Sequence, residues 1–138
     1  MNLFKTISTT ILLVMSFTSL AEVSVIVNTA NTDTFDEKTI KRIYLGKIKA
    51  LANGEKVSVL TLADDAPETE QFRESALNKS NSQFKSYWSK IAFTGKGTPP
   101  TEVASNAEMI NAIKSDPSSI GFINSNAVTG DVKVVATF

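Results

Sequence analysis

Short apolar runs that are rich in β-branched residues alternate along this chain with segments of helix-type spacing. The strand-type runs occupy residues 22–28, 57–62, 119–124 and 131–138. The helix-type segments lie between them and begin near residues 34, 67, 80 and 105. This alternation is typical of an α/β sandwich, in which helices flank a mainly parallel or mixed sheet. We expect one such domain, with the run at 57–62 beside the run at 22–28.

Three capping boxes and two glycines predict where the helices begin and end. In a capping box, a Ser or Thr side chain and a Glu or Gln side chain three residues later each accept a hydrogen bond from a free backbone N–H. The sequence has this pattern three times, in Thr34 with Glu37, Ser80 with Gln83, and Ser105 with Glu108. Gly46 and Gly95 follow helix-type segments and suit the left-handed position that ends a helix.

The helix predicted after Ser80 has an aromatic stripe. Its members are Phe84, Tyr87 and Trp88, and Ile91 follows at the same helical spacing. Such a stripe is more often part of the core than a platform for a ligand, so we expect it to pack inward.

The first 21 residues have the features of a secretory signal peptide. Lys5 supplies the positive charge, residues 7–20 form an apolar run, and small residues stand at Ser19 and Ala21. A membrane anchor is the rival interpretation, but polar residues dilute this run, and a spanning helix needs about 20 apolar residues. We expect cleavage after Ala21 and a periplasmic domain over residues 22–138.

The composition excludes several classes of function. The chain has no cysteine and no histidine, so His/Cys zinc sites and His-dependent nucleophilic catalysis are not available to it. Lys5 is the only charge before residue 22, so 13 of the 14 basic residues then face 14 acidic ones, a net charge of −1. This balance does not provide the basic surface that nucleic-acid binding needs. A Ser–Lys dyad at Ser89 and Lys90 has no supporting motif, so we expect no enzyme, cofactor or metal.

Several motifs resemble those of the substrate-binding proteins of phosphate ABC transporters. The most specific are YLGK at residues 44–47 and the P-x-x-IGF pattern at 117–122, with FTGKG at 93–97 between them. The resemblance covers nearly all of residues 22–138 and is strongest to short, single-domain members. It implies a single lobe of the type 2 periplasmic binding-protein fold. Full-length members of the family have two α/β lobes and hold phosphate in the cleft between them.

The sequence departs from the family at the site where one lobe contacts phosphate. The family typically has an arginine soon after the strand that corresponds to residues 57–62, then a Ser-Gly-Thr triplet that opens the next helix. Here residues 66–69 read APET, so only Thr69 keeps a hydroxyl, and Arg73 lies one turn further in. A helix N-terminus attracts anions, but four carboxylates crowd this one: Asp64, Asp65, Glu68 and Glu70. An ordinary acidic helix start is therefore favoured over a working anion site.

The loop FTGKGTPP at residues 93–100 is not a Walker A motif, because it lacks the G-x-x-x-x-G-K-[ST] spacing and follows a helix. Its glycines most simply end the helix and turn the chain, and Lys96 remains free to project toward a ligand. The candidate ligand-binding residues are Thr69, Glu70, Arg73, Lys96 and Thr98.

Two functions follow from the resemblance. The first is an exported solute-binding-like protein that binds phosphate or a similar oxyanion and passes it to a membrane transporter. The alternative is a periplasmic protein–protein interaction module without a working ligand cleft. An exposed apolar patch near Phe93 or at the sheet edge would be its structural sign.

Overall fold

Five strands form one mixed sheet in the order β3-β2-β4-β1-β5. The computed structural model describes residues 22–138, so the predicted signal peptide lies outside the described residues. The strands are β1 (Val23–Asn28), β2 (Ser58–Thr61), β3 (Thr101–Glu102), β4 (Ser119–Asn124) and β5 (Val132–Thr137). β2 is parallel to β3 and β4, while β1 is antiparallel to β4 and β5. The predicted mixed sheet is confirmed.

The prediction that β2 lies beside β1 is wrong. β4, and not β2, lies beside β1, and β2 lies beyond β4. All six residues of β1 and five of the six residues of β4 are buried, whereas the first two residues of β2 are half-exposed. The two most buried strands therefore take adjacent places in the sheet, although they are far apart in the sequence.

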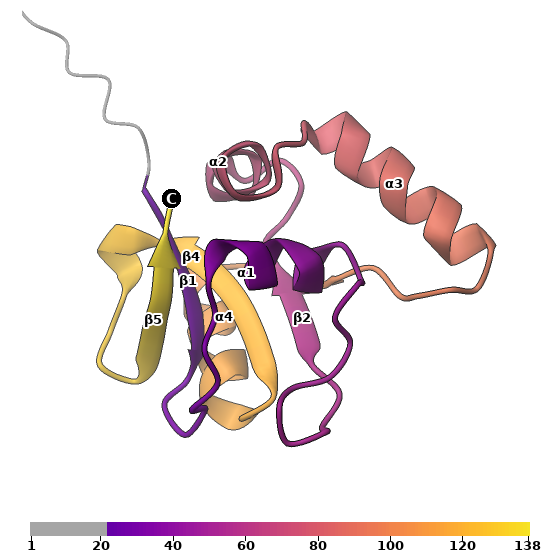
Figure 1. The fold of residues 1–138 in the computed structure, drawn as a ribbon. Helices are drawn as coiled ribbons and strands as arrows, with labels where there is room; N and C mark the ends of the chain where they lie inside the picture. The colour runs from indigo at the N-terminus through magenta and orange to yellow at the C-terminus, as the bar shows by residue number, and fades with distance from the viewer. Residues whose placement is uncertain (1–21) are drawn as a thin grey trace, which may run out of the picture.

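Helices cover both faces of the sheet (Figure 1). They are α1 (Glu37–Tyr44), α2 (Pro67–Leu77), α3 (Asn81–Phe93) and α4 (Asn106–Ser115), with a 3₁₀ turn, η1, at Ser125–Ala127. Figure 1 shows α4 behind the sheet and α1 in front of it, while α3 extends outward beyond α2. The loop at residues 94–100 then returns the chain from the outer end of α3 to β3.

Two of the three predicted capping patterns begin a helix. At Ser80 both capping-box hydrogen bonds are present. Ser105 caps α4, but the Glu108 carboxylate accepts its bond from the N–H of Ala104. The prediction of a capping box at Thr34 is wrong. Phe35 is buried before the helix starts, and Asp36 is the N-cap. The Asp36 carboxylate accepts a hydrogen bond from the Thr39 N–H at 2.7 Å. An Asp side chain caps a helix as well as a Thr side chain does.

An aromatic cluster joins α1 and α2 to β4. The Phe72 and Phe122 rings stack with centroids 4.3 Å apart, and the Tyr44 ring meets Phe72 edge-on at 4.6 Å. The Tyr44 hydroxyl donates a hydrogen bond to the Leu60 carbonyl at 2.8 Å. Burial raises the pKa of Tyr44, so this hydroxyl stays protonated. The cluster fixes the end of α1, which forms one wall of the site described next.

Candidate functional site

The N-terminus of α2 follows the carboxyl end of β2, the usual position of a ligand in an open α/β sheet. Its first turn contains Glu68 and Glu70, and its N-cap, Ala66, has no side chain that could accept a hydrogen bond. Thr69 is fully buried, and its hydroxyl donates to the Ala63 carbonyl at 2.7 Å. The hydroxyl is thus used inside the protein, and the carboxylates of the first turn complement the helix dipole themselves.

Arg73 lies within α2, and its guanidinium group bonds to neighbouring side chains. It is 3% exposed and stands 2.8 Å from an Asp64 carboxylate oxygen. It also donates to the Asn81 side chain at 3.1 Å and lies 4.1 Å from the Phe84 ring centre. These three contacts engage the planar group, so Arg73 holds α2, α3 and the preceding loop together.

Asp64 completes this charged cluster at the base of α2. Its second carboxylate oxygen lies 3.1 Å from the Lys85 ammonium group. Partial burial acts to raise the pKa of Asp64, but the hydrogen bonds from Lys85 and Arg73 outweigh it and hold that pKa below its ordinary value. Asp64 is therefore ionised at neutral pH and neutralises the nearest basic groups.

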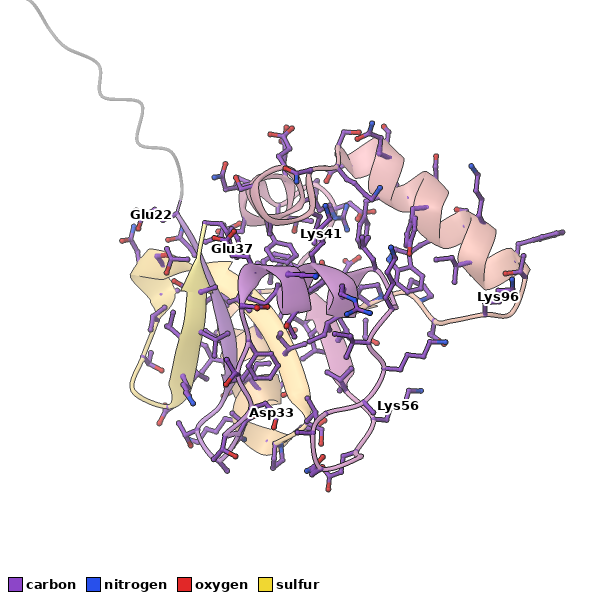
Figure 2. The ribbon with its side chains drawn as sticks, in the orientation of Figure 1. Glu22, Asp33, Glu37, Lys41, Lys56 and Lys96 are labelled. Carbon is purple, nitrogen blue, oxygen red and sulfur yellow. The ribbon has the colours of Figure 1, made fainter. Side chains whose placement is uncertain are left out.

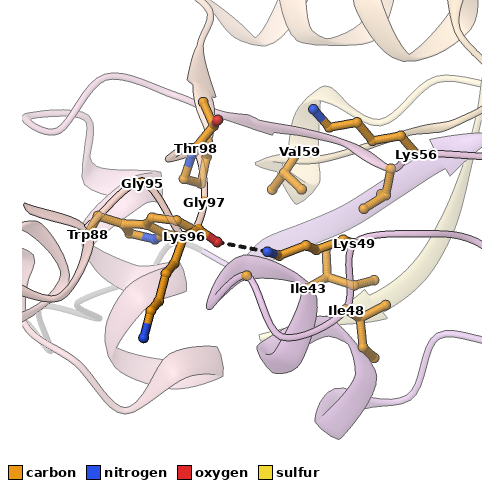
Figure 3. A pocket seen from close by; sticks show the side chains of 13 residues that line it. Ile43, Ile48, Lys49, Lys56, Val59, Trp88, Gly95, Lys96, Gly97 and Thr98 are labelled. Atoms are coloured by element: carbon orange, nitrogen blue, oxygen red, sulfur yellow. Dashed lines mark hydrogen bonds between the residues drawn. The ribbon is translucent and has the colours of Figure 1, made fainter. Parts of the chain in front are cut away.

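A hollow of about 430 Å³ lies between the end of α1, the loop that follows it and the loop at residues 95–100. We call it the lysine hollow (Figure 3). Its wall is made of apolar side chains, three lysines, and loop residues with small or no side chains: Ile43, Ile48, Val57, Val59, Trp88 and Pro100; Lys49, Lys56 and Lys96; Gly46, Gly95, Gly97 and Thr98.

The charge of the lysine hollow has a single sign. None of the described residues that line it is acidic. The Lys49 ammonium group donates to the Lys96 carbonyl at 2.7 Å, which ties the two loops together and uses one of the three donors of this group. Figure 2 shows Lys56 and Lys96 at one end of the molecule, while Glu22 and Glu37 lie at the other.

Trp88 forms the back of the lysine hollow and joins α3 to α1. Its indole N–H donates to the Tyr44 carbonyl at 3.1 Å, and the side chain is 6% exposed. A Cβ added to Gly46 would lie 2.7 Å from the Trp88 ring, and one added to Gly97 would lie 3.3 Å from it. Glycines at both positions let the two loops approach the indole closely.

The five predicted ligand-binding residues fall into two groups. Lys96 and Thr98 line the lysine hollow, although in Figure 3 the Lys96 ammonium group points away from Lys49. Thr69, Glu70 and Arg73 belong to α2. The structure therefore does not gather the five residues at one place.

Sequence reasoning missed the other two lysines of the hollow. Lys49 and Lys56 flank a tight turn at Asn53 and Gly54, and the bridge between Ala50 and Lys56 brings the two arms of this turn together. Two lysines on the arms of one tight turn were the available signal for a shared basic surface.

A second hollow, of about 390 Å³, separates the lysine hollow from the start of α2. Its lining has charges of both signs, from Asp64, Arg73, Lys85 and Glu102.

Among residues 22–138, no group of three acidic side chains lies close enough together to hold a metal ion. Within the same residues, each helix is too short or too polar to cross a membrane.

Comparison with known proteins supports the fold. No protein-family model matches the sequence. A search of curated proteins gives no significant match. Solved structures do match: an ABC-type phosphate transport receptor from Vibrio cholerae has 21% identity and a TM-score of 0.56, over 85% of this chain and 47% of that one.

Two further solved structures give closer superpositions. One is a substrate-binding protein from Clostridium perfringens, ascribed to a phosphate ABC transporter and holding bound phosphate, with 17% identity and a TM-score of 0.66 over 84% of this chain and 45% of that one. The other is PstS from Borrelia burgdorferi, with 18% identity and a TM-score of 0.63 over 84% and 47%. The chain spans less than half the length of these proteins. The predicted single-lobe fold of periplasmic binding-protein type is confirmed.

Proposed function

We propose that this chain is an exported, non-enzymatic solute-binding protein that takes a small oxyanion of the phosphate type and passes it to a membrane transporter. The observation that carries the proposal is the lysine hollow, in which Lys49, Lys56 and Lys96 line one cavity with no acidic residue among its described lining. The likeness of the fold to phosphate-transport receptors supports the class of solute.

The electrostatics of the two places favour the lysine hollow over the start of α2. Lysine ammonium groups bind phosphate oxygens as point charges with several donors. At α2, by contrast, Glu68 and Glu70 occupy the first turn, and Asp64 already neutralises Arg73. An incoming anion would meet carboxylates there, so we place the oxyanion in the lysine hollow, with the Thr98 hydroxyl as a further donor.

Calorimetric titration of phosphate into the purified protein at low salt, with sulfate as a second anion, tests this function. We expect saturable phosphate binding below the millimolar range. Lys49→Gln and Lys56→Gln should each weaken it by about tenfold, as expected for loss of one charge-assisted contact of about 1.4 kcal/mol. Lys38→Gln is the matched control, because Lys38 is exposed in the first turn of α1 and does not line the hollow.

The titration also distinguishes the two candidate places. If Thr69→Ala abolishes binding while Lys49→Gln and Lys56→Gln leave it intact, the oxyanion binds at α2 and the assignment to the lysine hollow is wrong. If the unaltered protein shows no binding up to millimolar phosphate or sulfate, the solute-binding function itself is wrong.

One observation favours the second function, a periplasmic protein–protein interaction module. Phe93, the last residue of α3, is 92% exposed, and α3 extends outward from the sheet (Figure 1). A photo-crosslinking residue at position 93, with position 38 as control, tests this in cells. A discrete adduct formed only from position 93 would support an interaction surface at this end of α3, and equal labelling from both positions would contradict it.

A further inference from the structure

The lysine hollow is larger than a bare oxyanion requires. Its volume is about 430 Å³. It falls within the range of about 300–1,000 Å³ that is usual for pockets that bind small organic molecules. Inorganic phosphate, with one phosphorus and its oxygens, would leave most of this space to water.

The wall between the lysines is apolar. Ile48, Val59 and Pro100 line the hollow and are each half-buried, so part of each side chain faces the open space. Figure 3 shows Ile48 and Val59 interspersed with the lysine side chains. Removing apolar surface from water is favourable by about 25 cal/mol per Å². A ligand that covers this wall therefore gains free energy that an inorganic anion cannot.

From this juxtaposition we infer that the lysine hollow binds a small amphiphilic oxyanion, in which a phosphate or carboxylate group is attached to an alkyl or aryl part. The oxyanion contacts Lys49 and Lys56, and the apolar part covers Ile48 and Val59. The inference rests on the proposed function, since it names the class of solute for the same hollow.

Trp88 makes the inference directly measurable. It is the only tryptophan in the sequence, and its ring forms the back of the hollow. Its fluorescence therefore reports on occupation of this place. Three probes separate the two features of the ligand. Phenyl phosphate has both the oxyanion and the apolar ring, inorganic phosphate has only the oxyanion, and phenol has only the ring.

We expect phenyl phosphate to bind at least tenfold more tightly than inorganic phosphate, and phenol to bind more weakly than either. A tenfold ratio corresponds to about 1.4 kcal/mol, which the coefficient above equates with roughly 55 Å² of covered apolar surface. Lys56→Gln should weaken both anions by a similar factor. Ile48→Thr should bring the phenyl phosphate affinity toward that of inorganic phosphate without changing the latter.

Pro100→Ser is a second wall variant in case Ile48→Thr does not fold, and Lys38→Gln is the control that should change nothing. If both anions bind with equal affinity, the amphiphilic class is wrong and the proposed function stands. If neither anion binds, the proposed function falls and the inference falls with it. If phenyl phosphate binds but neither Lys56→Gln nor the wall variants alter its affinity, the ligand lies outside this hollow and the inference is overturned.

Discussion

Substitution of Gly46 by alanine tests the contact that builds the back wall of the lysine hollow. Gly46 has φ of +71°, and an added Cβ would lie 2.7 Å from the Trp88 ring. The left-handed backbone costs a residue with a Cβ about 1–2 kcal/mol. The clash adds about 1–3 kcal/mol, the usual range for overpacking a core, because the hydrogen bond from Trp88 to the Tyr44 carbonyl keeps the indole in place.

Gly95→Ala is a matched control for the backbone term. Gly95 has nearly the same φ, +68°, but a Cβ there would meet no atom within 4 Å. Both variants therefore have the cost of a left-handed alanine, and only Gly46→Ala has the clash with Trp88. The difference between them isolates the packing of the α1 end against α3.

Urea unfolding followed by Trp88 fluorescence measures this difference. We expect Gly46→Ala to be less stable than Gly95→Ala by about 1–3 kcal/mol. That is a difference in midpoint of about 0.7–2 M urea at a slope of about 1.5 kcal/mol per M. The folded Gly46→Ala variant should also show altered Trp88 emission and weaker anion binding. Equal loss of stability in the two glycine variants would refute the argument that the indole and Gly46 are in tight contact.

Three further predictions concern the helix starts and the charged cluster at α2. Asp36→Ala should lower the urea midpoint while Thr34→Ala leaves it unchanged, since Asp36 is the N-cap of α1. Asp64 has a lowered pKa despite its partial burial, so it stabilises the fold above its unfolded-state pKa and loses that contribution as the pH falls through the folded-state pKa. Asp64→Asn should therefore reduce the drop in stability between about pH 6 and about pH 3, measured by urea titration at each pH. Arg73→Ala should lower stability by about 1.5–3 kcal/mol, as for loss of hydrogen bonds to a charged group, and yet leave phosphate binding unchanged; loss of binding in a folded Arg73→Ala protein would argue for a site at α2.

Local signals predicted most of the elements. Ser80 with Gln83 forms both bonds of a capping box, and Gly46 and Gly95 take left-handed conformations after α1 and α3. Each of these features depends on residues a few positions apart, so the sequence contains the whole interaction. The two-residue strand β3 was missed because Thr101 and Glu102 are exposed and follow two prolines, without an apolar run.

The order of the strands in the sheet could not be predicted from such local signals. β4 and β1 are adjacent because these two strands bury nearly all their side chains, and this depends on how α1, α2 and α4 cover the sheet. The prior that consecutive strands lie side by side favoured β2 next to β1.

The lysine hollow was only half predicted for a similar reason. Its lining comes from residues 43–59 and 88–100, two segments that no single motif spans. Lys96 and Thr98 were found because their loop is part of a recognisable block, while Lys49 and Lys56 stand on an ordinary turn. Residues 75–101 contain four lysines and no acidic residue, although the whole chain has equal numbers of both, but only Lys96 of these four lines the hollow.

Acidic and basic residues are separated between the start of α2 and the lysine hollow. The carboxylates gather at the start of α2, where they complement the helix dipole and neutralise Arg73, while the basic residues of the hollow lie on the segments that follow α1 and α3. A chain of near-zero net charge provides no long-range field to attract an anion, so an anion must be captured by local potential. At the hollow that potential comes from side chains that are largely exposed, and added salt screens such charges over about 10 Å at 0.1 M. An apolar contact is not screened in this way, and for that reason a ligand with an apolar part would keep more of its affinity at physiological salt than inorganic phosphate would.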